Sequence, residues 1–248
     1  MTMTQVIETR SNGTVELPET ANFGEFPDAE QLVGALAAKV AKVLTAAIQA
    51  NGSATLAVSG GSTPIPFFEA LNQMPLQWDK VQILLVDERF VPTSDDASNT
   101  RLVRHHLLKN HARQAKLIEV AVDAADAVAA AEETNSRYAE LHWPLDCCVL
   151  GMGNDGHTAS LFPGSPQLAM ACSEDTTRYC CMAEPTGAPH ARITLTLPKI
   201  RSANVLILHI AGAAKLDTLR EALEGMAQPE LMPVRYVLNR PLSIFWTP

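Results

Sequence analysis

The chain has 248 residues, of which 47% are hydrophobic and 19% are charged, and its formal net charge is −8 at pH 7. That much apolar material can build a folded core without disulfides or metals, and it excludes extended disorder. An acidic chain without a run of basic residues is poorly suited to nucleic acid or to an anionic membrane surface, so neither partner is expected.

Helical and strand patterns alternate in the first half of the chain. Apolar residues recur at three- and four-residue spacings over 28–50, which predicts a helix with Asp28 as its N-cap and Asn51-Gly52 as its stop. The further predictions here are a strand at ATLAVSG, a helix from Pro64 to about Met74, a strand at VQILLVDE, a helix capped by Ser98 and running to about Lys109, and a helix over 123–141.

The second half continues the alternation. Strands are predicted at DCCVLGMG, RYCCMAE, ARITLTL, NVLILHIAG, RYVLN and LSIFW, with a helix over 213–225 stopped by Gly225. Continuous apolar strands joined by helices indicate an α/β fold: a doubly wound, mostly parallel sheet with helices on both faces. No linker divides the chain, so one domain over 1–248 is expected, with residues 1–27 left unassigned.

Membrane and secretory segments are not expected. Apolar stretches such as VQILLV and NVLILHIAG are shorter than the ~18–20 residues of a spanning helix, and the N-terminus has no secretory pattern. The five cysteines include the adjacent pairs Cys147–Cys148 and Cys180–Cys181, which suit neither a disulfide nor a shared metal. Reduced thiols and a cytoplasmic location are therefore predicted.

The segment SGGSTP, residues 59–64, joins a predicted strand to a predicted helix. Gly60 and Gly61 allow close backbone approach, while Ser62 and Thr63 add hydroxyl groups beside the free N–H groups of the helix start. This pattern indicates a phosphate cradle, with an ordinary turn as the alternative. It is not a Walker loop, because no lysine follows the glycines.

GMGNDG, residues 151–156, matches the GxGxxG dinucleotide pattern, but we reject that interpretation. Pro163-Gly164 follows too soon for the sustained helix that a dinucleotide fingerprint needs. The turn instead presents Asp155 and His157 at a strand end, which favours acid–base chemistry, with a structural histidine as the alternative. A triad of Ser59, His157 and Asp155 has no support in the spacing.

Charged residues follow other predicted strands. Asp87 and Arg89 come after VQILLV, and the arginine fork suits a phosphate or a developing oxyanion, although local ion pairing is equally compatible. Arg192 begins ITLTL and Lys215 follows NVLILHI. Both cations could complete a phosphate site or simply face solvent.

Taken in order, SGGSTP, DERFVP…SN, LGMGNDGHTASLFPGS, RITLTLPKI and GxxK resemble the 6-phosphogluconolactonases of the pentose phosphate pathway, from about residue 31 to 246. The resemblance implies a Rossmann-like fold, as in glucosamine-6-phosphate deaminase and ribose-5-phosphate isomerase. It also implies a sugar-phosphate substrate, no required metal or cofactor, and a monomer or homodimer.

The same resemblance carries roles onto single residues. His157 matches the proposed general base and Arg89 an arginine near the reacting end of the substrate, while Asp87 and Asp155 match acidic positions with less settled roles. Two sets match phosphate-binding positions, namely Gly60, Gly61, Ser62 and Thr63 in the loop, and the cations Arg192 and Lys215. We expect hydrolysis of 6-phospho-D-glucono-1,5-lactone, with His157 taking a proton from water.

Three alternatives stay open at this level. A glucosamine-6-phosphate deaminase has an acidic residue before the proline where this chain has Phe162-Pro163, which argues against that activity. A sugar-phosphate sensor on the same fold would bind without turnover, and such sensors usually carry a DNA-binding segment that is not evident here. In the third alternative His157 is structural and the loop binds another phosphate.

Overall fold

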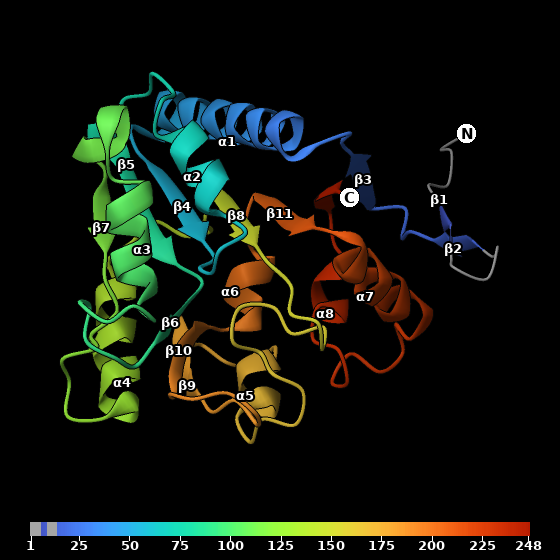
Figure 1. Ribbon diagram of the computed structural model, residues 1–248. Helices are drawn as coiled ribbons and strands as arrows, with labels where there is room; N and C mark the ends of the chain where they lie inside the picture. The colour runs from blue at the N-terminus through green and yellow to red at the C-terminus, as the bar shows by residue number, and fades with distance from the viewer. Residues whose placement is uncertain (1–5, 9–13) are drawn as a thin grey trace.

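The protein is described by a computed structural model over residues 6–8 and 14–248 (Figure 1). Its strands are β1 Val6–Glu8, β2 Thr14–Glu16, β3 Ala21–Glu25, β4 Ala54–Val58, β5 Val81–Leu85, β6 Asp87–Arg89, β7 Lys116–Ile118, β8 Cys147–Leu150, β9 Cys180–Ala183, β10 Arg192–Leu195, β11 Val205–Ala211 and β12 Leu242–Thr247. Its helices are α1 Ala29–Asn51, α2 Ile65–Leu71, α3 Asn99–His106, α4 Ala127–Ala139, α5 Leu168–Cys172, α6 Leu197–Arg201, α7 Ala213–Glu224 and α8 Arg235–Leu238, with 3-10 turns η1 Trp78–Lys80 and η2 Asn110–Gln114.

The centre of the molecule is a seven-stranded sheet in the order β3-β12-β11-β8-β4-β5-β7. Every pair of neighbouring strands in this sheet is parallel. All residues of β4 and β8 are buried, as expected for apolar strands covered on both faces. The predicted doubly wound α/β fold is confirmed.

Helices cover both faces of this sheet (Figure 1). One core cluster packs α1, α2 and α3 against one face, and a second packs α4, α6, α7 and α8 against the other. β11 shows the division within one strand, since Ile207 belongs to the first cluster and Leu208 to the second. The alternation of side chains along a strand thus sends neighbours into different cores.

The longest helix, α1, begins and ends where its sequence predicts. The Asp28 carboxylate accepts the Gln31 backbone N–H at 2.8 Å, and Gly52, at φ 81°, donates its N–H to the carbonyl of Ile48 at 2.8 Å. Within the described residues, α1 is the one helix long and apolar enough to cross a membrane by length and composition. Its buried residues, however, pack against the sheet, so its apolar stripe is already occupied.

A smaller antiparallel sheet, β6-β10-β9, lies below the central sheet in Figure 1 and was not predicted. The strand expected at VQILLVDE splits at Val86, which donates its N–H to Val58 and accepts from Leu195. Val86 thereby joins both sheets, and the next three residues turn away to pair with β10. RYCCMAE and ARITLTL are strands, as predicted, but they belong to this antiparallel sheet.

The strand predicted at RYVLN is wrong, because residues 235–238 form the short helix α8. The guanidinium of Arg235 donates to the carbonyls of Ala222, Glu221 and Gln228, which fixes the turn against the end of α7. A segment of four residues is too short to show either a helical or a strand period, so tertiary contacts decide its conformation.

Part of the N-terminal segment left unassigned by the sequence joins the central sheet. β3 pairs in parallel with β12 and forms one edge of the sheet. The rings of Phe23 and Trp246 stack across this pair, with centroids 6.1 Å apart. Residues 1–5 and 9–13 of that segment lie outside the described residues.

Candidate active site

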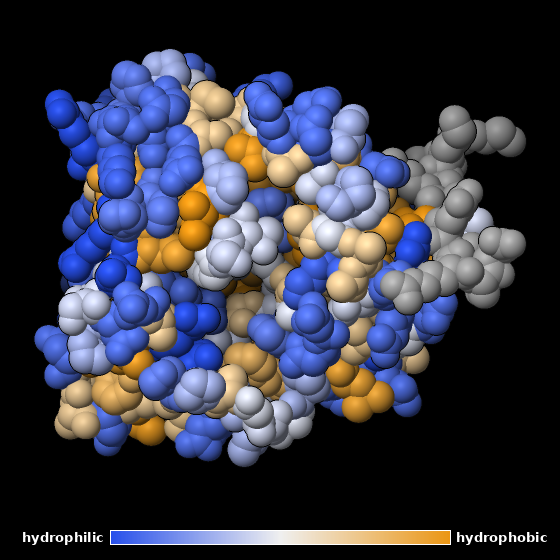
Figure 2. All heavy atoms as spheres, viewed as in Figure 1, coloured by the Kyte–Doolittle hydropathy of each residue, from blue (hydrophilic) through white to orange (hydrophobic). Residues whose placement is uncertain are grey.

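A cleft opens at the carboxyl ends of β4, β8 and β11, where ligands bind in doubly wound sheets. The hollow in the middle of the face shown in Figure 2 lies in this part of the molecule. The predicted site residues that line the cleft are Gly60, Gly61, Thr63, Asp87, Arg89, His157 and Lys215. Asp155 lies directly behind His157, whereas Ser62 and Arg192 do not line the cleft.

His157 and Asp155 form a pair in the turn that follows β8. Nδ1 of His157 lies 2.6 Å from Oδ1 of Asp155, which also accepts the His157 backbone N–H at 3.2 Å. With Nδ1–H donated to the carboxylate, Nε2 keeps a free lone pair that can accept a proton. The imidazole packs on Phe162, with ring centroids 4.5 Å apart. The pair therefore has the arrangement of an oriented general base.

Glycine is required where this turn passes beneath the pair. A Cβ at Gly153 would lie 2.1 Å from Nδ1 of His157 and 2.5 Å from Oδ1 of Asp155. The Gly153 N–H donates to the carbonyl of His157 at 2.8 Å and closes the turn. The next helix, α5, begins only at Leu168, so this GxGxxG match does not open a helix.

The pKa of the Asp155 carboxylate depends on its hydrogen bond with His157, and stability measured against pH can test this. The hydrogen bond from His157 lowers the pKa of Asp155 from 3.8 to about 2. Above the pKa of 3.8 expected for the unfolded chain, the lowered pKa of Asp155 contributes fully to stability, and this contribution is lost as pH falls from about 4 through 2. We expect Asp155→Asn to lower the urea midpoint at pH 6 and the difference from wild type to vanish below pH 2. An unchanged difference across this range would contradict the pairing.

The loop from Ser59 to Pro64 is held at the mouth of the cleft by its neighbours. Ser59 donates its hydroxyl to the carbonyl of Val149 at 3.1 Å and accepts the N–H of Gly151 at 3.0 Å, which ties β4 to β8. This structural role leaves Ser59 outside any nucleophilic triad. A Cβ at Gly60 would lie 1.9 Å from Oδ1 of Asn99, and Gly61 has φ +91°. Both glycines are therefore needed for the path of this loop.

The DER segment forms β6 and points two of its side chains into the cleft. Asp87 accepts the hydroxyl of Ser160 at 2.6 Å, and Nη1 of Arg89 donates to the carbonyl of Ala97 at 2.5 Å. Glu88 faces the opposite way and is fully buried. Its carboxylate accepts the backbone N–H groups of Arg89, Asn99 and Thr100 and the hydroxyl of Ser98. Glu88 thus anchors the start of α3 behind the cleft.

The two predicted phosphate cations differ in position. Lys215 lines the cleft at the start of α7, where burial lowers its pKa and the nearby Asp155 opposes that shift. Arg192 lies opposite Arg89 in the β10–β6 pair and is buried. Its Nη1 donates to the carbonyls of Pro189 and His190 at 2.8 and 2.9 Å. In this structure Arg192 holds the preceding loop, and its predicted contact with phosphate stays a prediction.

Three residues of the site were not singled out from the sequence. Asn99 lines the cleft and donates its side-chain N–H to the carbonyl of Asp87 at 2.8 Å, while Glu88 organises the loop behind it. His209 lines the cleft from within β11. The motif SN contained a signal for Asn99, but a histidine inside an apolar strand carries no local signal. Within the ranges 6–8 and 14–248, no three His, Cys, Asp or Glu side chains cluster as metal ligands.

Comparisons with known proteins place this arrangement among its relatives. Residues 27–246 match the family model of glucosamine-6-phosphate isomerases/6-phosphogluconolactonase. The chain is 45% identical to a 6-phosphogluconolactonase of Rhizobium meliloti over 92% of its own length and 100% of the relative. It is 42% identical to one of Pseudomonas aeruginosa over 94% and 98% of the two chains.

A solved structure shows the same similarity in three dimensions. The crystal structure of a 6-phosphogluconolactonase from Shewanella baltica superposes with a TM-score of 0.90 and 40% sequence identity. The match covers 94% of this chain and 100% of that one.

Proposed function

The chain belongs to the glucosamine-6-phosphate isomerase/6-phosphogluconolactonase family, and we propose that it uses His157 as the general base in hydrolysis of 6-phospho-D-glucono-1,5-lactone. The activity itself rests on relatives that share at least 42% of its residues over nearly the whole chain. The observation that carries the mechanism is the Asp155–His157 pair at the wall of the cleft.

The lactone is an activated ester, so water can open it without a covalent enzyme intermediate. Nε2 of His157 takes a proton from water as the oxygen attacks the lactone carbonyl carbon, and a tetrahedral oxyanion forms. Collapse breaks the bond between that carbon and the ring oxygen. The imidazolium returns its proton to the departing ring oxygen, which yields the carboxylic acid and a hydroxyl group.

Asp155 assists both proton transfers, the one from water to His157 and the one from His157 to the ring oxygen. Its carboxylate keeps Nδ1 protonated, so that Nε2 is the nitrogen that faces the substrate. It also stabilises the imidazolium between the two proton transfers. The general-base contribution of such a histidine is typically ~10²–10⁴-fold in rate.

The remaining cleft residues divide between the oxyanion and the phosphate. Arg89 presents a guanidinium to the cleft and can stabilise the oxyanion. The N–H groups of the loop Gly60–Thr63 and the ammonium of Lys215 are the donors that suit a phosphate. Binding energy from the phosphate then positions the ring for attack. These local cations offset the net charge of −8.

A direct assay tests this function against deamination and against binding without turnover. Fresh 6-phosphogluconolactone is supplied to the protein, and 6-phosphogluconate is measured with its dehydrogenase and NADP after subtraction of spontaneous opening. We expect a strong enzymatic rate and no ammonia from glucosamine 6-phosphate. Ammonia release would indicate a deaminase, and binding of 6-phosphogluconate without turnover would indicate a sensor.

The proposal extends to the compartment and the assembly of the protein. All five cysteines are free thiols, which supports the cytoplasm as the compartment. A monomer or homodimer, without nucleic-acid or membrane partners, stays a prediction. Light scattering of the purified protein measures its assembly directly.

A further inference from the structure

His209 is a buried ionisable side chain of the cleft for which the mechanism above has no role. It lies in β11, is 6% exposed, and lines the cleft. Burial lowers its pKa from 6.5 to about 4, so the imidazole is uncharged at neutral pH. A neutral imidazole carries one N–H donor and one acceptor nitrogen.

The ring of His209 has no polar partner among the described residues. Its recorded contact is with the ring of Phe67, an edge-on approach with centroids 6.3 Å apart and planes at 75°. Among the described residues, the ring nitrogens of His209 are not fully buried polar atoms, so they open onto the cleft, where a ligand can reach them. An unpartnered imidazole in the wall of a ligand cleft therefore indicates a hydrogen bond that the ligand completes.

The fold shows which end of the ligand lies near this ring. Phe67 is on α2, the helix that the loop Gly60–Thr63 opens, and Ile207 belongs to the same core cluster as Phe67. His209, two residues after Ile207, extends this face of β11 toward α2.

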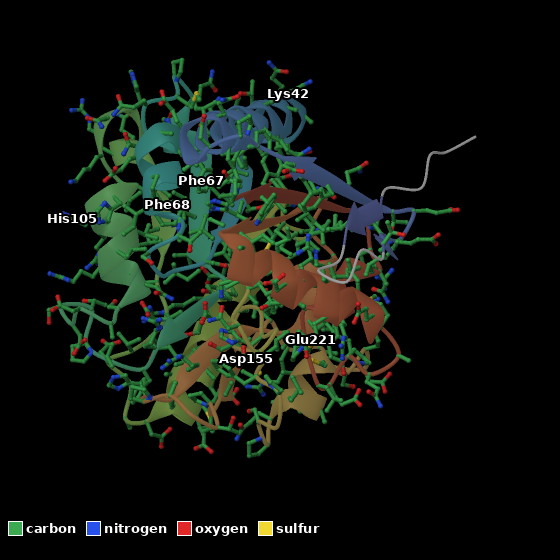
Figure 3. All side chains as sticks on the ribbon, turned by 45° about the vertical axis from the view of Figure 1, so that its right-hand side comes forward. Lys42, Phe67, Phe68, His105, Asp155 and Glu221 are labelled. Carbon is green, nitrogen blue, oxygen red and sulfur yellow. The ribbon has the colours of Figure 1, made fainter. Side chains whose placement is uncertain are left out.

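The catalytic turn packs against α7, since Thr218 donates its hydroxyl to the carbonyl of Asn154 at 3.4 Å. Lys215, in the first turn of the same helix, also lines the cleft and is near Asp155, so its ammonium is the phosphate donor on the catalytic side. In Figure 3, Phe67 is labelled on α2 and Asp155 is labelled near α7, well apart from it.

We propose that His209 donates its imidazole N–H to the phosphate group of the bound substrate, beneath the loop Gly60–Thr63. The proposal deepens the proposed function and rests on it. The imidazole adds a donor from the floor of the cleft to the donors of the loop and to the ammonium of Lys215. The hydrogen bond from His209 would therefore favour the phosphorylated lactone over the same lactone without phosphate.

Substitution of His209 by phenylalanine removes the donor but keeps an aromatic ring of similar size. We expect His209→Phe to raise KM for 6-phosphogluconolactone about tenfold with little change in kcat, as loss of a hydrogen bond to a charged group predicts. His209→Gln restores an N–H donor and should recover part of that loss. Hydrolysis of unphosphorylated glucono-1,5-lactone should be unchanged in His209→Phe. Thermal melting confirms that each variant is folded.

A binding measurement completes the test without turnover. Calorimetric titration with inorganic phosphate should show weaker binding to His209→Phe than to wild type. The proposal would be overturned if His209→Phe left both KM and the affinity for inorganic phosphate unchanged. It would also be overturned if His209→Phe lowered hydrolysis of the two lactones equally, because the contact would then be with the sugar ring. If the wild type fails to open the lactone, the proposed function fails, and the phosphate titration still decides the role of His209.

Discussion

Replacing His157 by alanine is expected to lower kcat/KM for 6-phosphogluconolactone by about 10²–10⁴-fold. The imidazole is the group that faces the cleft with a free Nε2 and a carboxylate on its other nitrogen. Without it, water must attack without a base, although phosphate binding and the Arg89 guanidinium persist. KM should therefore change much less than kcat. The measurement is the coupled assay, with spontaneous hydrolysis subtracted.

The chain contains a matched control for this substitution. His106 on α3 also pairs through Nδ1 with a carboxylate, that of Glu69 at 2.9 Å, but it lies outside the cleft. His106→Ala should keep close to wild-type activity. A wild-type rate in His157→Ala would leave the lactonase activity intact and exclude His157 as the base.

Replacing Gly153 by alanine is expected to cost about 10²-fold or more in kcat, although no catalytic group is removed. The new methyl carbon would lie 2.1 Å from Nδ1 of His157, so the imidazole and the Asp155 carboxylate must both move. A base displaced by about 1 Å can lose this much rate. The neighbouring Gly151 offers a contrast, because a Cβ there would meet only Cβ of Ser59, at 4.0 Å.

Gly151→Ala should therefore retain far more activity than Gly153→Ala in the same assay. The double variant Gly153→Ala with His157→Ala adds a sharper criterion. If the methyl group acts by displacing the base, it should cost little once the base is gone. If the rate loss of the double variant equals the product of the two single losses, Gly153 does not act through the position of His157. A fully active Gly153→Ala would show that the added methyl group does not displace the imidazole.

The position of the predicted strand ends explains why so much of the site could be anticipated. SGGSTP, DERF and GMGNDGH each follow an apolar segment, and the carboxyl ends of parallel strands meet at one edge of the sheet. Gly60, Arg89 and His157 thus line one cleft although they are far apart in the chain. Ser62 and Arg192 show the limit, because a motif places a backbone position and does not aim its side chain.

The sequence by itself determined the five longer helices of the described chain and most strands, the caps of α1 and the order of the motifs, because these depend on local periodicity and on the side chains next to each turn. Only the tertiary structure decided that β6 leaves the central sheet, that residues 235–238 form a helix and that Arg192 binds its own loop. The tertiary structure alone showed that His157 and Asp155 leave no room for a Cβ at Gly153, and that the ring of His209 has no polar partner among the described residues. These features come from contacts between distant segments, which no local pattern records.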